Sequence, residues 1–108
     1  MIFEWRIYEI IPGKKKALGE RFAKHTLRLF KKHGMEVVGF WESAIGGRSN
    51  AYYYMLAFKN LGHLEEAWRS FSSDPEWQEV VATSEKDGQL VSSITNMVLR
   101  PTYFSPLQ

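Results

Sequence analysis

The amino-acid sequence predicts an α+β fold in which a four-stranded antiparallel sheet carries two helices on one face. Segments with strand-like and helix-like patterns occur in the order strand, helix, strand, strand, helix, strand. Turns that contain glycine or proline separate these segments. A chain of 108 residues with 44% hydrophobic residues is expected to form one domain, residues 1–108. This order is that of a ferredoxin-like βαββαβ sandwich, which leaves one face of its sheet uncovered.

The first strand is predicted over residues 2–11, where the character of the side chains alternates. Successive side chains of a strand point to opposite faces of the sheet. The more apolar set is expected beneath the helices and consists of Phe3, Trp5, Ile7 and Ile11. The set expected on the uncovered face consists of Glu4, Arg6 and Tyr8.

A long helix is predicted over residues 14–33, because apolar side chains recur there at three-to-four spacing without any proline. Pro12 and Gly13 end the preceding strand, and Gly34 favours a left-handed residue after the helix. His25 lies on the apolar stripe of this helix, so we expect it to pack beneath the sheet.

Residues 35–43 and 50–58 are rich in β-branched and aromatic side chains and predict a hairpin, joined by a glycine-containing loop at 44–49. On the second of these strands, the side chains expected on the uncovered face are Asn50, Tyr52, Tyr54, Leu56 and Phe58. Those expected beneath the helices are Tyr53, Met55 and Ala57.

The second helical region begins with a helix at 61–71. A short further helix follows, because Ser73 or Asp74 provides an N-cap and Pro75 suits the first helical turn. The last strand is predicted over 90–100.

An uncovered sheet face with so many aromatic side chains is not expected to remain in water on a monomer. A second copy related by a twofold axis would cover the face and close a barrel with a chamber between the two sheets. The sequence therefore predicts a homodimer, with higher assembly left open.

Several short motifs are spread along the chain. They are Glu4-x-Arg6-x-Tyr8 with Pro12-Gly13-Lys14, Lys32-His33-Gly34, Gly39-Phe40-Trp41, Gly47 followed by Asn50, the junction from Phe58 to Ala67, Asp74-Pro75-Glu76-Trp77, and Phe104-Ser105-Pro106-Leu107. Together these motifs resemble the NIPSNAP family. The resemblance covers nearly the whole chain. It implies a dimeric α/β barrel, an architecture shared with cofactor-independent monooxygenases, haem-degrading oxygenases and small isomerases, but it implies no reaction. Tyr54 stands where relatives often carry histidine, which argues against a histidine-dependent chemistry.

The candidate ligand-binding residues are Glu4, Arg6, Tyr8, Trp41, Asn50, Tyr52 and Tyr54. Arg6 and Glu4 lie two residues apart on one strand, so either Arg6 binds an anionic ligand or the two form a structural salt bridge. Tyr8 and Tyr54 are hydrogen-bond donors to a carbonyl or enolate oxygen, or else wall residues satisfied locally. Trp41 and Asn50 flank the hairpin and are similar to an Asn–Trp pair of the haem-degrading relatives.

Three function classes remain open on this basis: a small-molecule binding dimer, an enzyme of the monooxygenase or isomerase type, and a purely structural dimer. No catalytic residue is assigned, and no cofactor or metal site is expected, because cysteine is absent and the three histidines are scattered. The chain has no phosphate-binding glycine motif, and its formal charge of +2 and lack of the RNA-recognition signature argue against nucleic acid. We expect a cytoplasmic protein with no membrane association, and without the mitochondrial leader of eukaryotic relatives.

Charge is distributed unevenly along the chain. Residues 14–32 carry eight basic side chains against one acidic, and residues 65–87 carry seven acidic against two basic. Two interpretations are open: two solvated faces of opposite sign, or an attraction between subunits.

Overall fold

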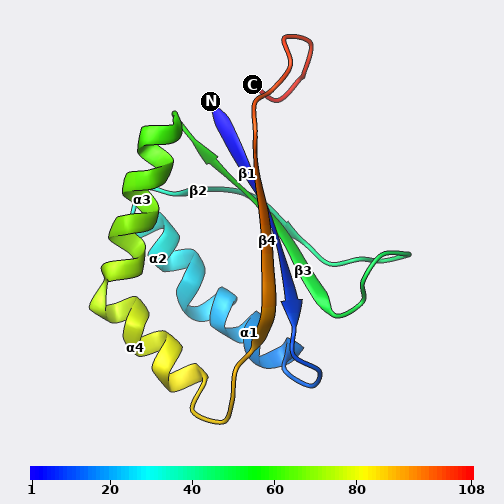
Figure 1. Ribbon diagram of the computed structural model, residues 1–108, viewed down its shortest axis with the longest axis vertical. Helices are drawn as coiled ribbons and strands as arrows, with labels where there is room; N and C mark the ends of the chain where they lie inside the picture. Colours follow the sequence, from blue (N-terminus) through cyan, green and yellow to red (C-terminus); the bar gives the residue numbers. More distant parts are fainter.

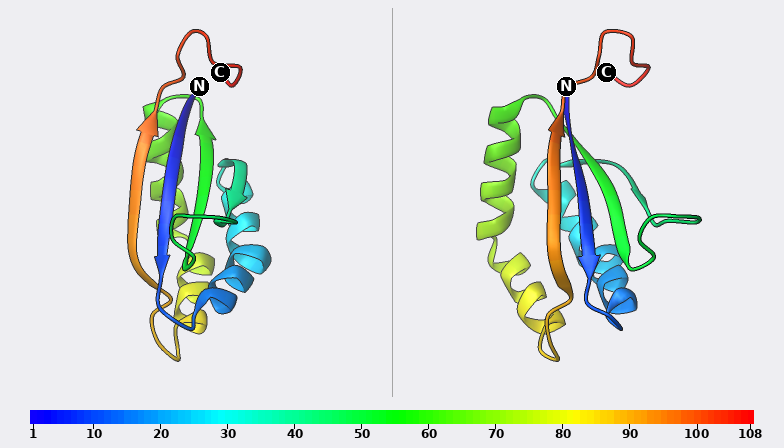
Figure 2. Two further views of the ribbon diagram at one scale, coloured as in Figure 1. Left: turned by 90° about the vertical axis from the view of Figure 1, so that its right-hand side faces the viewer. Right: turned by 45° about the vertical axis from the view of Figure 1, so that its right-hand side comes forward.

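The computed structural model describes all 108 residues and confirms the predicted order of elements. The strands are β1 (Ile2–Ile10), β2 (Glu36–Trp41), β3 (Ala51–Phe58) and β4 (Val91–Leu99). They form one antiparallel sheet in the order β2-β3-β1-β4 (Figure 1). The helices all lie on one face, and the other face is bare (Figure 2). The ferredoxin-like α+β fold is therefore confirmed.

The first helical region contains a π turn that the sequence did not indicate. It consists of α1 (Lys15–Arg21), the π-helix η1 (Phe22–Thr26) and α2 (Leu27–Lys32). The backbone N–H of Leu27 donates to the carbonyl of Phe22, five residues back, which is the π-helical hydrogen bond. Gly34 has a φ of +72°, so the expected left-handed residue after this helix is confirmed.

The second helical region begins and ends near the predicted residues. In α3 (Leu61–Ser73), the side chain of Asn60 accepts a hydrogen bond from the N–H of His63. In α4 (Pro75–Ser84), Asp74 is the N-cap and accepts from the N–H of Glu76 at 2.9 Å. Of the two predicted caps, Ser73 and Asp74, the structure has Asp74, which stands between the end of α3 and the start of α4.

The predicted facing of β1 and β3 was wrong by one residue. The side chains beneath the helices are Glu4, Arg6 and Tyr8 on β1, and Tyr52, Tyr54, Leu56 and Phe58 on β3. The opposite face carries Phe3, Trp5, Ile7, Tyr53, Met55 and Ala57. Because the side-chain period of a strand is two, a one-residue error exchanges the faces completely. The physical reason is that Glu4 and Arg6 find polar partners under the helices, while Leu56 and Phe58 become fully buried there.

The core lies between this sheet face and the helices. Its largest fully buried side chains are Tyr54, Phe30, Phe58, Leu18, Leu29, Leu56 and Leu90. Phe22 is central, since its ring contacts those of Tyr8, Tyr54 and Phe40 at centroid distances of 5.4, 5.6 and 4.9 Å. The core therefore joins β1, β2 and β3 to the first helical region.

The opposite charges of the two helical regions meet within the chain. Arg21 pairs with Glu85 at 3.0 Å, and Arg28 pairs with Glu76 at 2.6 Å. Lys32 lies 2.8 Å from Asp74. Neither of the two interpretations of the charge pattern foresaw this, because the charges connect α1 and α2 to α4 inside one protomer.

Candidate functional site

A buried polar network lies at the centre of the sheet, on the face that the helices cover. Glu4 is 2% exposed, and three donors approach its carboxylate. Arg6 Nη1 and Asn96 Nδ2 each lie 2.8 Å from Oε2, and Trp68 Nε1 lies 2.7 Å from Oε1. These donors come from β1, β4 and α3, so Glu4 joins the sheet to the helical layer through satisfied hydrogen bonds.

The guanidinium of Arg6 is packed as tightly as the carboxylate. Its Cζ lies 4.3 Å from the ring centroid of Trp68, and its Nε donates to the hydroxyl of Tyr54 at 2.7 Å. Burial disfavours the charged form of Arg6, but Tyr54, Tyr8 and Glu4 outweigh it, so its pKa lies above the ordinary value. Arg6 is therefore a fixed positive charge inside the domain.

The hydrogen bonds of this network run in one direction. Arg6 donates to Tyr54, and Tyr54 donates its single hydroxyl hydrogen to the oxygen of Tyr8 at 3.1 Å. Burial and the neighbouring Tyr8 raise the pKa of Tyr54 well above its ordinary value, although Arg6 acts in the opposite direction, so Tyr54 keeps its proton. Tyr8 ends the chain, with its hydroxyl group bonded to that of Tyr54.

Tyr8 also forms part of the wall of a groove between α4 and β4. The groove has a volume of about 370 Å³. Its walls include Trp77 and Val81 from α4 and Ile94 from β4, with the Arg21–Glu85 ion pair at the same site. The buried network therefore reaches a concave surface through Tyr8.

The structure brings together four of the seven predicted site residues, namely Glu4, Arg6, Tyr8 and Tyr54. The other three lie elsewhere. Tyr52 borders a different cavity beside α1, and Asn50 donates to the carbonyl of Ile10 at 2.6 Å, which fixes the end of the hairpin. Trp41 lies on the bare face, with its ring 5.8 Å from that of Trp5.

Two members of the network were missed by the sequence reasoning. Trp68 lies in the helix predicted at 61–71, and the helical pattern gives no sign that its indole N–H meets Glu4. Asn96 stands opposite Arg6 on β4. An asparagine in the middle of a predicted strand is a weak signal of a buried polar partner, because asparagine is depleted in strands.

A second polar cluster contains serine, histidine and aspartate, the residue types of a hydrolase triad, but it does not border the groove. His33 Nδ1 lies 2.6 Å from Ser70 Oγ, and His33 Nε2 lies 2.7 Å from Asp74 Oδ2. Hydrogen bonds from Lys32 and His33 hold the pKa of Asp74 well below its usual range. Asp74 is also the N-cap of α4, and none of the cavities described borders these residues. The cluster connects α2, α3 and α4, and we assign it no catalytic role.

No group of three or more histidine or carboxylate side chains is placed to hold a metal ion. None of the helices combines the length and the apolar character that crossing a bilayer requires.

Comparison with known proteins gives a consistent result. The NIPSNAP family model matches residues 3–106. The human protein NipSnap homolog 3A is 33% identical over 79 residues, which is 73% of this chain and 31% of the relative. The mouse protein NipSnap homolog 3B is 31% identical over 77 residues, 71% of this chain and 30% of the relative. The chain thus spans about a third of the length of these relatives.

Solved structures show the same fold. A NIPSNAP family protein of unknown function from Agrobacterium tumefaciens has a TM-score of 0.86 and 28% identity, and the match covers 100% of this chain and 94% of that one. A putative antibiotic biosynthesis monooxygenase from Nitrosomonas europaea has a TM-score of 0.65 and 11% identity, over 95% of this chain and 100% of that one. This second likeness concerns the fold alone.

Proposed function

The chain belongs to the NIPSNAP family, and from its buried network we propose that it binds a small organic molecule in the groove between α4 and β4. The ligand presents an acceptor oxygen, either a carboxylate or a carbonyl, to the hydroxyl of Tyr8, which lines the groove. This site lies within one protomer, between the sheet and the helices. It replaces the expectation of a chamber between two sheets, because Glu4, Arg6, Tyr8 and Tyr54 lie on the helix-covered face.

The observation that carries this proposal is the position of Tyr8, which belongs both to the network and to the groove wall. Within the protein, the hydroxyl group of Tyr8 lies 3.1 Å from that of Tyr54. Arg6 stands behind it, with Cζ 5.7 Å from the centroid of the Tyr8 ring. An acceptor oxygen in the groove would give the hydroxyl of Tyr8 a second partner, and hydrogen bonds in a chain strengthen one another.

The groove walls support an organic ligand over a simple inorganic anion. Trp77, Val81 and Ile94 supply flat and branched apolar surface, and the guanidinium of Arg21, paired with Glu85, supplies a polar group in the same wall. A site of about 370 Å³ falls within the range of small-molecule pockets. We infer a compact, partly aromatic carboxylate or ketone as the ligand class.

A second candidate is an enzyme of the monooxygenase or isomerase type using the same residues. The hydroxyl of Tyr8, with the guanidinium of Arg6 behind its ring, is suited to stabilise the oxygen of an enolate as negative charge develops on it. Turnover would require the ligand to carry an acidic C–H beside the carbonyl.

The bare face of the sheet supports the proposal of a homodimer. Trp5 packs against Trp41 and Tyr53 on this face, with centroid distances of 5.8 and 6.0 Å. Met97 is 50% exposed and Leu99 is 37% exposed beside them. A continuous apolar surface of this kind is suited to a second copy. The dimer interface and the ligand groove then lie on opposite faces of the sheet.

The ligand proposal is tested by NMR titration with three probes of similar size. Benzoate and acetophenone carry an acceptor oxygen, and toluene does not. We expect benzoate to shift the resonances of Tyr8 and Ile94, and Tyr8→Phe to weaken it about tenfold, since one charge-assisted hydrogen bond is lost. Tyr103→Phe, at an exposed position, is the control. If benzoate binds the wild type and Tyr8→Phe with equal affinity, the network has only a structural role and the proposal is wrong.

A further inference from the structure

A second cavity lies between the first helical region and the strands β2 and β3. It has a volume of about 480 Å³, and six of its eight lining residues are hydrophobic. Phe22 separates it from the buried network, because its ring packs against Tyr8 on one side and against Phe40 and Tyr52 on the other. This cavity takes no part in the proposed function.

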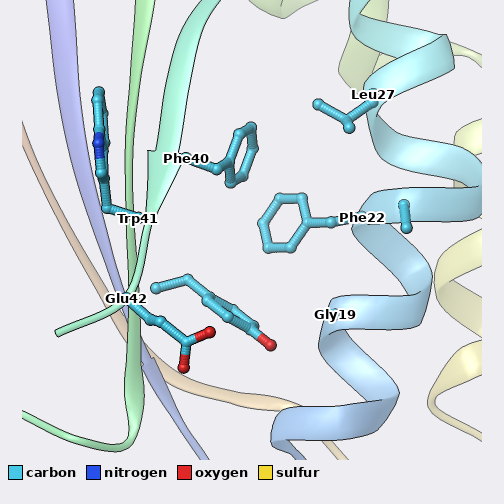
Figure 3. A pocket seen from close by; sticks show the side chains of 8 residues that line it. Gly19, Phe22, Leu27, Phe40, Trp41 and Glu42 are labelled. Atoms are coloured by element: carbon cyan, nitrogen blue, oxygen red, sulfur yellow. The ribbon is translucent and has the colours of Figure 1, made fainter. Parts of the chain in front are cut away.

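The walls of the cavity are shaped by one helix face and two strands. Phe22 and Phe40 point toward each other across it, Leu27 borders it from α2, and Trp41 points away (Figure 3). Gly19 and Ala23 occupy successive turns of the helix wall and leave the space open. A β-carbon on Gly19 would lie 2.7 Å from the hydroxyl oxygen of Tyr52, so this close approach depends on glycine.

The π turn lies in the same wall. Phe22 and Ala23 begin η1, and Leu27 follows it. π turns in helices occur frequently at functional sites. The wall is therefore irregular where an uninterrupted α-helix would be expected, and the irregular turn supplies lining residues.

The mouth of the cavity has an exchangeable ion pair. Lys15 Nζ lies 2.8 Å from Glu42 Oε1, and the two side chains are 32% and 62% exposed. Lys15 is also held by the carbonyl of Ser49 at 3.0 Å and lies 5.6 Å from the ring centroid of Tyr52. Glu42 has only Lys15 as a partner, so another carboxylate can replace it at little cost.

Two further ammonium groups border the helix wall. Lys16 is three residues before Gly19, and Lys31 is four residues after Leu27, so each is a helix-surface neighbour of a lining residue. Neither forms an ion pair within the chain. Glu20 and Lys24, three residues before Ala23 and Leu27, pair with each other at 4.0 Å, so Lys16 and Lys31 leave this helix surface with a net positive charge, which attracts anions.

We propose that this cavity binds the apolar part of an amphipathic anion, a fatty or arylalkyl carboxylate, whose carboxylate displaces Glu42 from Lys15. The hydrocarbon contacts Phe22, Leu27 and Phe40. The apolar interior selects for hydrocarbon, and Lys15 selects for the anion over the alcohol or amine.

The test is isothermal titration calorimetry with dodecanoate, dodecanol and dodecylamine. We expect saturable binding of dodecanoate. Ala23→Phe fills the cavity and weakens binding at least about tenfold, because excluding two methylenes already gives that loss. Ala17→Phe, an exposed position of α1 that does not line the cavity, leaves binding unchanged. Lys15→Gln weakens dodecanoate but not dodecanol, whereas the exposed Lys59→Gln affects neither.

A second measurement uses NMR of the wild-type protein, so it does not depend on whether a variant folds. Dodecanoate should shift the resonances of Ala23, Leu27 and Phe40. Shifts confined to Trp5 and Met97 on the bare face, or affinity unchanged in Ala23→Phe, would overturn the proposal. Because Tyr8→Phe removes only the donor of the groove, dodecanoate binding should survive it, so this proposal and the proposed function fail separately.

Discussion

Replacing Glu4 by glutamine tests the buried network most directly. The carboxylate receives Arg6 and Asn96 on one oxygen and Trp68 on the other, at 2.7–2.8 Å. Glutamine has one acceptor oxygen and one NH₂ group, so in either orientation at least one of these donors faces another donor. The substitution keeps the shape of the side chain and removes its charge.

The magnitude follows from two losses. One unsatisfied buried donor costs about 1–3 kcal/mol. Arg6 also loses its ionised partner, and breaking a buried ion pair costs about 3–5 kcal/mol in total. Since Glu4 is 2% exposed and Arg6 is 12% exposed, solvent compensates for little of this loss, and we expect Glu4→Gln to lower the free energy of unfolding by about 3 kcal/mol.

Urea unfolding followed by tryptophan fluorescence measures this free energy. Glu36→Gln, at an exposed position of β2 without an ion pair, is the control and should change it by less than about 0.5 kcal/mol. A double-mutant cycle with Arg6→Met should give a coupling energy of at least about 1 kcal/mol between the two residues. A loss below about 1 kcal/mol for Glu4→Gln would refute the reasoning, because it would mean that water satisfies the three donors.

Three more substitutions test other parts of the structure. Met97→Glu, on the bare face, should convert the proposed dimer to a monomer in light scattering. Ile94→Glu, on the other face of the same strand, should leave the dimer intact. Dissociation by both substitutions or by neither would contradict the proposed interface. Folding lowers the pKa of Asp74, so the ionised carboxylate stabilises the folded protein fully above the ordinary aspartate pKa. This stabilisation is lost as the pH falls through the pKa of the folded state. Asp74→Asn should therefore flatten the acid side of a plot of Tm against pH. Gly19→Ala places a β-carbon 2.7 Å from the Tyr52 hydroxyl, a clash of about 1–3 kcal/mol that the higher helix propensity of alanine offsets by about 1 kcal/mol, so urea unfolding should show a net loss of up to about 2 kcal/mol. Tyr52→Phe should remove this loss, because the next ring atom is 3.6 Å from the new β-carbon; no rescue would count against this contact.

The order of the elements could be predicted because the signals are local. Asp74 and Pro75 start α4, and Gly34 ends α2, through hydrogen bonds and dihedral angles within a few residues. The π turn was not predictable, because residues 22–26 have an ordinary helical composition.

The facing of β1 could not be predicted for a different reason. Phe3, Trp5 and Ile7 form the more apolar set, so the pattern alone favoured them as core. The opposite set is buried because Glu4 meets Trp68 and Asn96, which are 64 and 92 residues away in the chain. Glu4, Arg6 and Tyr8 still lie together, because residues two apart on a strand share a face whichever face that is, and Tyr54 joins them because it stands opposite Arg6 on β3.

The ion pairs between the first helical region and α4 also affect the ligand groove. The Arg28–Glu76 pair is half exposed on both sides, and the ammonium of Lys32 is 50% exposed beside Asp74. Pairs of this kind are weak singly and are screened by salt. The β4 side of the groove is instead fixed by the hydrogen bonds of the sheet. The α4 side is held by these pairs together with the contact of Trp77 with Phe71, at a centroid distance of 4.6 Å, so ionic strength acts on only part of what holds that side.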